Sequence, residues 1–198
     1  VSFGQGCEGE PLLAVDLAVE AVRLIRAETS AGTVNLNTNA SVPAAVKRLA
    51  EAGLDSMRVS LNSARGEIYR RYYRPTDYTF LDVLRSIDLA CEAGLFVSLN
   101  LLVFPGITDV EEELEALLVL HRRAPFQMVQ WRNLNVDPDE YLATMGDIPR
   151  GAPMGLDRFI DAAEEAIPGL ESGYFNPSLG GAQGAGGPKP QKTRRGDR

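Results

Sequence analysis

Two kinds of hydrophobic pattern alternate along the chain from residue 1 to about residue 168. Short apolar runs rich in β-branched side chains predict strands, and longer stretches with apolar positions three or four residues apart predict helices. The helical spacing is clearest at Phe80, Val83, Leu84 and Ile87. The expected strands cover residues 1–4, 33–37, 56–61, 96–103 and 127–133. The expected helices cover residues 12–29, 43–53, 78–94, 109–123 and 155–167.

The regular alternation of strand and helix predicts an α/β fold in which parallel strands are joined by right-handed crossovers. Gly53 and Gly94 each stand between an expected helix and the strand after it, where glycine often ends a helix. The expected strand at 96–103 is mostly apolar on both faces, which is typical of a parallel strand covered by helices.

Glycine or hydrogen-bonding side chains follow each expected strand. In chain order these segments are Gly9-Glu10, Asn37-Thr38-Asn39, Ser60-Leu61-Asn62-Ser63, Pro105-Gly106 and Arg132-Asn133-Leu134-Asn135. The carboxyl ends of parallel strands share one edge of a sheet, so these segments should converge. One such segment alone is more often a turn, but five in series predict a ligand site.

Composition and charge narrow the class of protein. The net charge of −7 argues against a nucleic-acid-binding surface. We expect residues 151–172 to form a C-terminal helix that packs on the core, and residues 173–198 to be a disordered Gly/Pro-rich basic tail. No apolar run approaches the roughly 20 residues that span a bilayer, so no membrane partner is expected. Cys7 and Cys91 offer no disulfide framework, which favours a cytoplasmic location.

The order and spacing of five short segments are similar to those of a known protein family. The segments are Gly9-Glu10-Pro11, Leu36-Asn37-Thr38-Asn39, Met57-Arg58-Val59-Ser60-Leu61-Asn62-Ser63, Tyr73-Arg74-Pro75 and Val103-Phe104-Pro105-Gly106-Ile107-Thr108-Asp109. By these segments the chain resembles the radical S-adenosylmethionine (radical SAM) superfamily, and by the last of them its activating-enzyme-like branch. The resemblance implies an α/β fold of the partial TIM-type (β/α)6 barrel kind, with residues 1–150 as the radical SAM core from the family's second strand onward.

The resemblance also implies a cofactor and the residues that contact it. In the family the Gly-Glu-Pro region receives the amino group of SAM, a role that would fall to Gly9 and Glu10. The ends of the next strands hold the ribose and the carboxylate, and the matching positions here are Asn37, Asn39, Ser60 and Asn62. We expect substrate contacts from the opposite side of the pocket, at Gln130, Arg132, Asn133 and Asn135. Trp131 alternates with these residues and should face the helices.

The activity that the resemblance implies belongs to the intact enzyme. In the family a 4Fe-4S cluster reduces bound SAM to methionine and a 5′-deoxyadenosyl radical, and this radical abstracts hydrogen from a substrate. The electron comes from a donor such as flavodoxin or ferredoxin. The substrate can be a small molecule, a peptide or a protein, and the sequence leaves this choice open. No residue is assigned a catalytic role.

One defining feature of the family is missing from this chain, the cysteine motif C-x3-C-x2-C that ligates the cluster. Cys7 and Cys91 are far apart in the sequence, and Cys91 falls on an apolar helical face where a buried thiol is expected. Iron–sulfur clusters need several convergent thiolates, so no metal ligand is assigned here. We expect that the chain is a fragment lacking the family's first β/α unit, that the cluster cysteines lie upstream of residue 1, and that the chain by itself is inactive.

Some interpretations stay open. A non-redox module could keep a SAM-like pocket without the cluster. An unrelated aldolase-like barrel is disfavoured because Lys47, the only lysine before the tail, lies on an expected helix and not at a strand end. Arg58 is either a structural ion-pair partner or a ligand contact. His121 lies at the basic end of its expected helix, where a cation is favourable.

Overall fold

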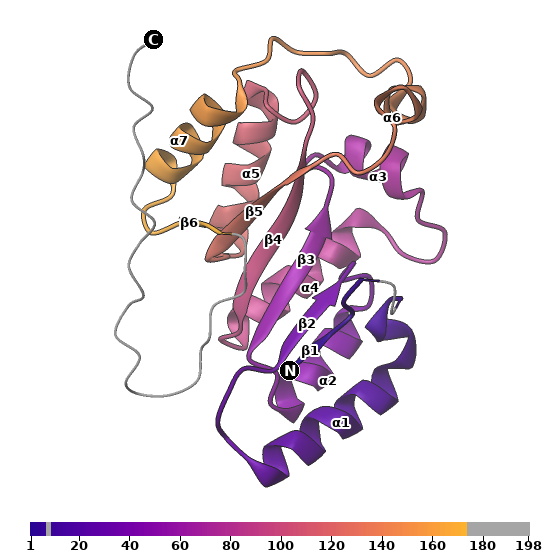
Figure 1. The fold of residues 1–198 in the computed structure, drawn as a ribbon, viewed down its shortest axis with the longest axis vertical. Coiled ribbons are helices and arrows are strands. Elements are labelled where there is room, and N and C mark those ends of the chain that lie inside the picture. The colour runs from indigo at the N-terminus through magenta and orange to yellow at the C-terminus, as the bar shows by residue number, and fades with distance from the viewer. Residues whose placement is uncertain (7–8, 174–198) are drawn as a thin grey trace.

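The computed structural model describes residues 1–6 and 9–173, and within these ranges six parallel strands form one sheet. The sheet order is the chain order, so every strand pairs with the strand next to it in sequence (Figure 1). The strands are β1 (Ser2–Phe3), β2 (Asn35–Thr38), β3 (Ser56–Leu61), β4 (Phe96–Val103), β5 (Met128–Asn133) and β6 (Glu171–Ser172). The predicted α/β fold with parallel strands is confirmed.

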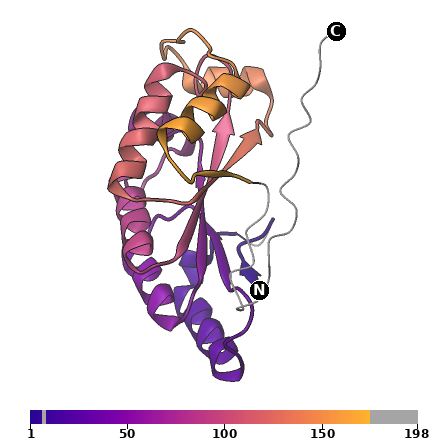
Figure 2. The same cartoon turned by 90° about the vertical axis from the view of Figure 1, so that its left-hand side faces the viewer.

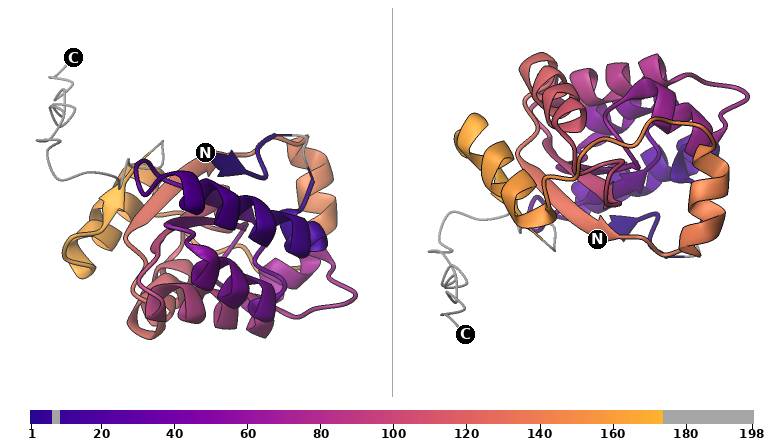
Figure 3. Two further views of the ribbon diagram at one scale, coloured as in Figure 1. Left: turned by 90° about the horizontal axis from the view of Figure 1, so that it is seen from below. Right: turned by 90° about the horizontal axis from the view of Figure 1, so that it is seen from above.

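The connections between the strands are helical. A 3-10 turn at Pro11–Ala14 leads into the first helix. The helices are α1 (Val15–Glu28), α2 (Pro43–Ala52), α3 (Gly66–Tyr73), α4 (Phe80–Glu92), α5 (Glu111–Arg123), α6 (Pro138–Met145) and α7 (Leu156–Ala166). Seen edge-on, α1, α2, α4 and α5 lie along one side of the sheet (Figure 2). Helices α3 and α6 contact each other beyond the carboxyl ends of the strands (Figure 3, right).

The strand register separates a polar face of the sheet from an apolar one. Asn37, Arg58 and Ser98 lie in one row across β2, β3 and β4, because they are register partners. Ser60, Asn100 and Gln130 form the next row toward the carboxyl edge. The alternate positions face the helices and are buried in the core; they include Leu36, Met57, Val59, Val97, Leu99 and Val129.

The expectation that strand 96–103 is apolar on both faces is therefore wrong in part. Ser98 and Asn100 lie on the face of β4 that the helices leave uncovered, whereas Val97, Leu99 and Leu101 are buried on the other face. A face that carries serine, asparagine, glutamine and arginine in successive rows is suited to hold a polar ligand. This face is called the inner face below.

Three elements were not expected from the sequence: α3, α6 and β6. The segment at 66–73, for which the sequence predicts no helix, is a helix that ends at Arg74, which has φ 45°. Helix α6 begins with Pro138 after Asp137, whose side chain accepts a hydrogen bond from Asp139 N at 2.8 Å. Helix α7 contacts α5. None of the helices in the described ranges is both long and apolar enough to cross a membrane.

Candidate functional site

Glu10 joins the ends of the first two strands. Its Oε1 accepts hydrogen bonds from Leu12 N (3.1 Å) and from the Thr38 hydroxyl (2.5 Å), and its Oε2 accepts one from Asn39 N (2.7 Å). A carboxylate has about four acceptor positions, and the described residues fill three of them here. Gly9 beside it is exposed and has φ +81°, a conformation that glycine adopts without strain.

A glycine lets β1 approach β2 closely at this point. Gly4 has φ +72°, and a Cβ on it would lie 2.2 Å from the Asn37 carbonyl oxygen and 2.7 Å from Pro11 Cγ. No other residue type fits there without moving the backbone. Gly4 therefore brings the turn that carries Glu10 over the end of β2.

The two asparagines expected at the end of β2 differ in what they do. Asn37 is 8% exposed and lies on the inner face, where its amide bonds to Asn35 (3.0 Å) and Ser2 (3.3 Å). Asn39 accepts a hydrogen bond from Ser41 N at 2.9 Å and so closes a local turn. The Asn39 side-chain oxygen thus stabilises the loop in this structure.

A pocket of about 320 Å³ opens at the carboxyl edge of β3, β4 and β5. Its walls hold five of the expected site residues, which are Ser60, Asn62, Arg132, Asn133 and Asn135. Its other lining residues are Leu61, Tyr72, Tyr73, Asn100 and Leu102. The structure thus brings the expected cofactor side and the expected substrate side together. Gly9, Glu10, Asn37, Asn39 and Gln130 are not part of this wall.

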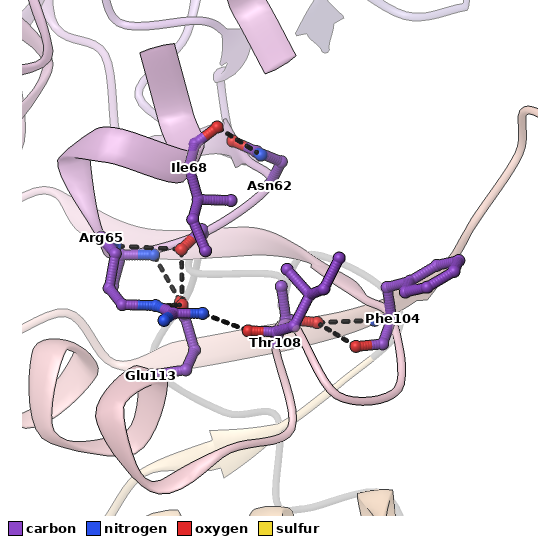
Figure 4. A network of polar contacts seen from close by, with 9 residues as sticks. Asn62, Arg65, Ile68, Phe104, Thr108 and Glu113 are labelled. Atoms are coloured by element: carbon purple, nitrogen blue, oxygen red, sulfur yellow. Dashed lines mark hydrogen bonds and ion pairs between the residues drawn. The ribbon is translucent and has the colours of Figure 1, made fainter. Parts of the chain in front are cut away.

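Two buried amide oxygens near this pocket, Oδ1 of Asn62 and Oδ1 of Asn100, make no hydrogen bond of normal geometry among the described residues. The Tyr141 hydroxyl also lacks such a bond, but it lies close enough to Asn62 for that amide to lower the pKa of Tyr141 and so offset part of the rise that burial causes. The other end of the Asn62 amide is fixed, because its Nδ2 donates to the Ile68 carbonyl at 3.2 Å (Figure 4). A buried acceptor without a donor costs roughly 1–3 kcal/mol, so both oxygens call for a ligand or an ordered water.

Aromatic side chains from α3 close one side of the pocket. Tyr72 and Tyr73 meet edge to face, with ring centroids 5.0 Å apart, and Tyr141 of α6 packs 5.7 Å from Tyr72. Burial raises the pKa of Tyr141 to about 12, and burial also raises the pKa of Tyr73. These hydroxyls therefore stay protonated at neutral pH and can donate hydrogen bonds.

Glu113 of α5, whose side chain is fully buried, holds the loop after β3 in place by hydrogen bonds (Figure 4). Its carboxylate accepts hydrogen bonds from the Ser63 hydroxyl (2.5 Å), from Ala64 N (2.5 Å) and from Arg65 Nε (3.0 Å). Burial raises the pKa of Glu113, and these donors offset part of the rise. The network fixes the backbone that immediately follows Asn62.

Arg58 lies deeper on the inner face. Its Nη1 donates to Gln130 Oε1 at 3.1 Å, and no ion pair of Arg58 occurs within residues 1–6 and 9–173. The interpretation of Arg58 as a structural ion-pair partner is therefore not supported. Trp131 faces the helices as expected, because its ring packs at 90° against Phe159 of α7.

No group of three or more His, Cys, Asp or Glu side chains that could hold a metal occurs in the described part of the chain. Cys91 is half-buried on α4, and burial raises the pKa of its thiol to about 11. Cys7 lies outside the described residues.

Comparison with known proteins identifies the family. The protein-family model of the radical SAM superfamily matches residues 5–118, more than half of the chain. The chain belongs to the radical SAM superfamily. This match excludes the unrelated aldolase-like barrel.

Curated relatives of this radical SAM chain include enzymes that cyclise GTP. A probable GTP 3′,8-cyclase of Methanosarcina mazei is 33% identical over 96 residues, which is 47% of this chain and 28% of the relative. A GTP 3′,8-cyclase of Sulfurovum sp. is 34% identical over 104 residues, 52% of this chain and 31% of the relative. The chain thus spans less than a third of the length of these relatives.

Solved structures share the fold of this radical SAM chain. A domain of a pyruvate-formate lyase-activating enzyme from Bacteroides vulgatus superposes with a TM-score of 0.61 at 11% identity, covering 88% of this chain and 98% of that domain. HydG, a maturase of the [FeFe]-hydrogenase, gives a TM-score of 0.56 at 18% identity, covering 82% of this chain and 38% of HydG. At these identities the likeness is one of fold, and it confirms the radical SAM type of partial barrel.

Proposed function

We propose that the chain is the part of a radical SAM enzyme that binds S-adenosylmethionine at the carboxyl edge of its sheet. The observation that carries the proposal is the pair of buried amide oxygens, Asn62 Oδ1 and Asn100 Oδ1, at a pocket lined by polar side chains. Both oxygens accept hydrogen bonds, and the ribose hydroxyls, the adenine amino group and the methionine ammonium of SAM are donors. The residues present therefore fit SAM.

The residues of the pocket and of the neighbouring strand ends have separate tasks in this proposal. The remaining acceptor position of Glu10 would take the ammonium group of SAM. The Ser60 hydroxyl would donate to its carboxylate, and Asn62 Oδ1 would accept from a ribose hydroxyl. Tyr72 and Tyr73 would exclude water from the reacting side. Gln130, Arg132, Asn133 and Asn135 would contact the substrate.

The described residues do not fit the second cofactor of the family, the 4Fe-4S cluster. The sequence has only Cys7 and Cys91, and a cluster of this kind needs convergent thiolates. We therefore propose that the cluster ligands lie upstream of residue 1 in the intact enzyme. In the intact enzyme such a cluster would supply the electron for the reductive cleavage of SAM, while the residues of this chain would hold SAM in place. An electron donor such as flavodoxin or ferredoxin and a cytoplasmic location belong to the same proposal.

Calorimetric titration of the chain with SAM tests the assignment of the two sides of the pocket. Asn62→Ala should weaken SAM binding about tenfold, because it removes both the buried acceptor and the bond to Ile68. Asn135→Ala, on the expected substrate side, should leave the affinity for SAM within about twofold of the parent. Equal loss in both variants, or no effect of Asn62→Ala, would contradict the proposal.

A second candidate function, a non-redox SAM-binding module, is favoured by the presence of only two cysteines. The coding sequence ahead of Val1 separates the two candidates. An in-frame C-x3-C-x2-C motif at the distance typical of the family would support the enzyme, and a continuous reading frame without it would support the module.

A further inference from the structure

The position of Arg58 on β3 places a guanidinium in the interior of the half-barrel. Arg58 is the register partner of Asn37 on β2 and of Ser98 on β4, both on the inner face. It precedes Ser60 by two residues, so it lies about 7 Å farther from the carboxyl edge at 3.3 Å per residue. Arg58 is half-buried there.

Among the described residues Arg58 has no acidic ion-pair partner. Its recorded hydrogen bond runs to the uncharged Gln130. The charged group that acts on it most is a second cation, Arg132. Burial and the charge of Arg132 both lower the pKa of Arg58.

Such an arrangement is unfavourable without an anion. Removing a charge from water costs free energy unless the charge is paired, and a neighbouring like charge adds to that cost. A guanidinium has five N–H donors in a planar fork, which matches a carboxylate or a phosphate group. Gln130 supplies an amide beside the fork, and Ser98 supplies a hydroxyl in the same row.

We propose that Arg58, together with Gln130 and Arg132, forms a subsite for an oxyanion of the substrate, a carboxylate or phosphate group, on the inner face, extending from the level of Arg58 to the wall of the SAM pocket that Arg132 lines. The inference rests on the proposed function, because it assigns the substrate class of the same site. It makes Arg58 a determinant of substrate specificity.

The carboxylate of SAM is a competing source of the same chemistry. The residues assigned to SAM stand at strand ends: Glu10 and Asn39 after β1 and β2, and Ser60 and Asn62 at the end of β3. Arg58 precedes Ser60 by two residues and Asn62 by four, so it lies farther from the carboxyl edge than either. When the ammonium and carboxylate groups of SAM are held at the strand ends, SAM does not occupy the space beside Arg58, and that space is open to the substrate.

The test measures binding of two simple oxyanions, inorganic pyrophosphate and malonate, to the full 198-residue chain by calorimetry. At least one of them should bind the parent. Arg58→Gln should weaken that binding at least tenfold, and Arg58→Lys should weaken it less, because lysine keeps the charge but loses the fork. Arg23→Gln, an exposed change on α1, should have no effect. Circular dichroism spectra that match the parent show that each variant is folded.

SAM binding measured on the same variants separates the two sources. Unchanged SAM affinity in Arg58→Gln, together with lost oxyanion binding, supports the substrate subsite. An equal loss of SAM affinity would assign Arg58 to the SAM carboxylate and overturn the inference. Failure of both oxyanions to bind the parent would also overturn it. If the parent binds an oxyanion through Arg58 but does not bind SAM, the proposed function fails while the anion subsite stands.

Discussion

Glu113, in the first turn of α5, accepts a 2.5 Å hydrogen bond from the hydroxyl of Ser63, which lies 50 residues earlier at the end of β3. Its second oxygen accepts from Ala64 N, and Arg65 completes the network from the same loop. The Arg65 guanidinium also donates to the Ile107 carbonyl, in the turn after β4. Through Arg65, this buried carboxylate connects the loop after β3 to the turn after β4. Asn62 lies at the start of that loop, and Asn100 lies in β4.

Replacing Glu113 should destabilise the chain strongly. Glu113→Ala removes one member of a buried pair and leaves Ser63, Ala64 and Arg65 without their acceptor, so it should lower the free energy of unfolding by about 3–5 kcal/mol. Glu113→Gln keeps the volume and one acceptor oxygen, and about 1–3 kcal/mol is expected. Urea unfolding followed by circular dichroism measures both.

Glu115→Gln is the matched control for this pair, because Glu115 lies on the same helix but is exposed. It should change the free energy of unfolding by no more than about 0.5 kcal/mol. A Glu113→Ala variant as stable as the Glu115→Gln control would show that the network contributes nothing to stability.

Most of the fold could be predicted from the sequence, because it depends on local periodicity. Strands at 56–61 and 96–103 have the expected bounds, since each has apolar side chains at alternate positions that face the core. Helix α3 was not predicted because only two of its residues, Ile68 and Tyr69, are buried. Two adjacent apolar positions show no helical periodicity in the sequence. Strand β6 has two residues, too few to show a period.

The site could be predicted only where its residues stand at strand ends. Ser60, Asn62 and Arg132 were found by that rule, and they line the pocket. Asn100 was missed because it stands inside β4, although a lone amide within an apolar run was a usable signal. Tyr72 and Tyr73 line the pocket because α3 packs beyond the strand ends. This packing is a tertiary feature that no local sequence pattern predicts.

His121 should titrate below its ordinary pKa of 6.5. Its ring packs edge-on against Phe126, with centroids 4.9 Å apart, and burial lowers the pKa, while a hydrogen bond to the Phe126 backbone offsets part of the effect. The sequence-based expectation of a favourable cation at this helix end predicts the opposite direction. His121 is the only histidine, so its ring protons can be followed by NMR without further assignment.

The sign of the linked stability change follows from this direction. The folded state binds the proton more weakly than the unfolded state, so the contribution of His121 to stability is present above the ordinary pKa and is lost as pH falls through the lowered one. The urea-unfolded chain provides the reference titration. A folded-state pKa above the unfolded one would mean that the helix dipole outweighs burial.

The chain should not assemble a four-iron cluster when it is reconstituted with iron and sulfide under anaerobic conditions. It has two cysteines, and the Cys91 thiol is half-buried with a pKa of about 11, so little thiolate is available at neutral pH. Iron per chain should stay far below four, and a double variant with Cys7→Ser and Cys91→Ser should give the same value. Iron near four per chain, with the matching absorbance, would contradict this prediction.

An exposed apolar stripe on the 3-10 turn and α1 should make the chain associate. Leu13, Leu17 and Leu24 are 85%, 73% and 60% exposed, and an apolar hollow of about 170 Å³ next to them is lined by Phe3, Pro11 and Ala18 among others. Strand β1 lies beside them at the edge of the sheet, where unpaired backbone groups favour association. Exposed apolar surface of this kind binds hydrophobic dyes and other molecules. We therefore expect concentration-dependent association in sedimentation velocity, together with enhanced dye fluorescence.

The double variant Leu17→Glu and Leu24→Glu should be monomeric and should bind less dye, because it places two charges in the stripe. Leu81→Glu is the control: Leu81 is 68% exposed but lies on α4, away from the stripe, so its replacement should leave association unchanged. Circular dichroism should show the same helix content in all three proteins. The prediction would be contradicted if the parent chain stays monomeric at every concentration, unfolds cooperatively and binds no dye. Such a result would mean that the exposed apolar stripe is solvated and does not promote association.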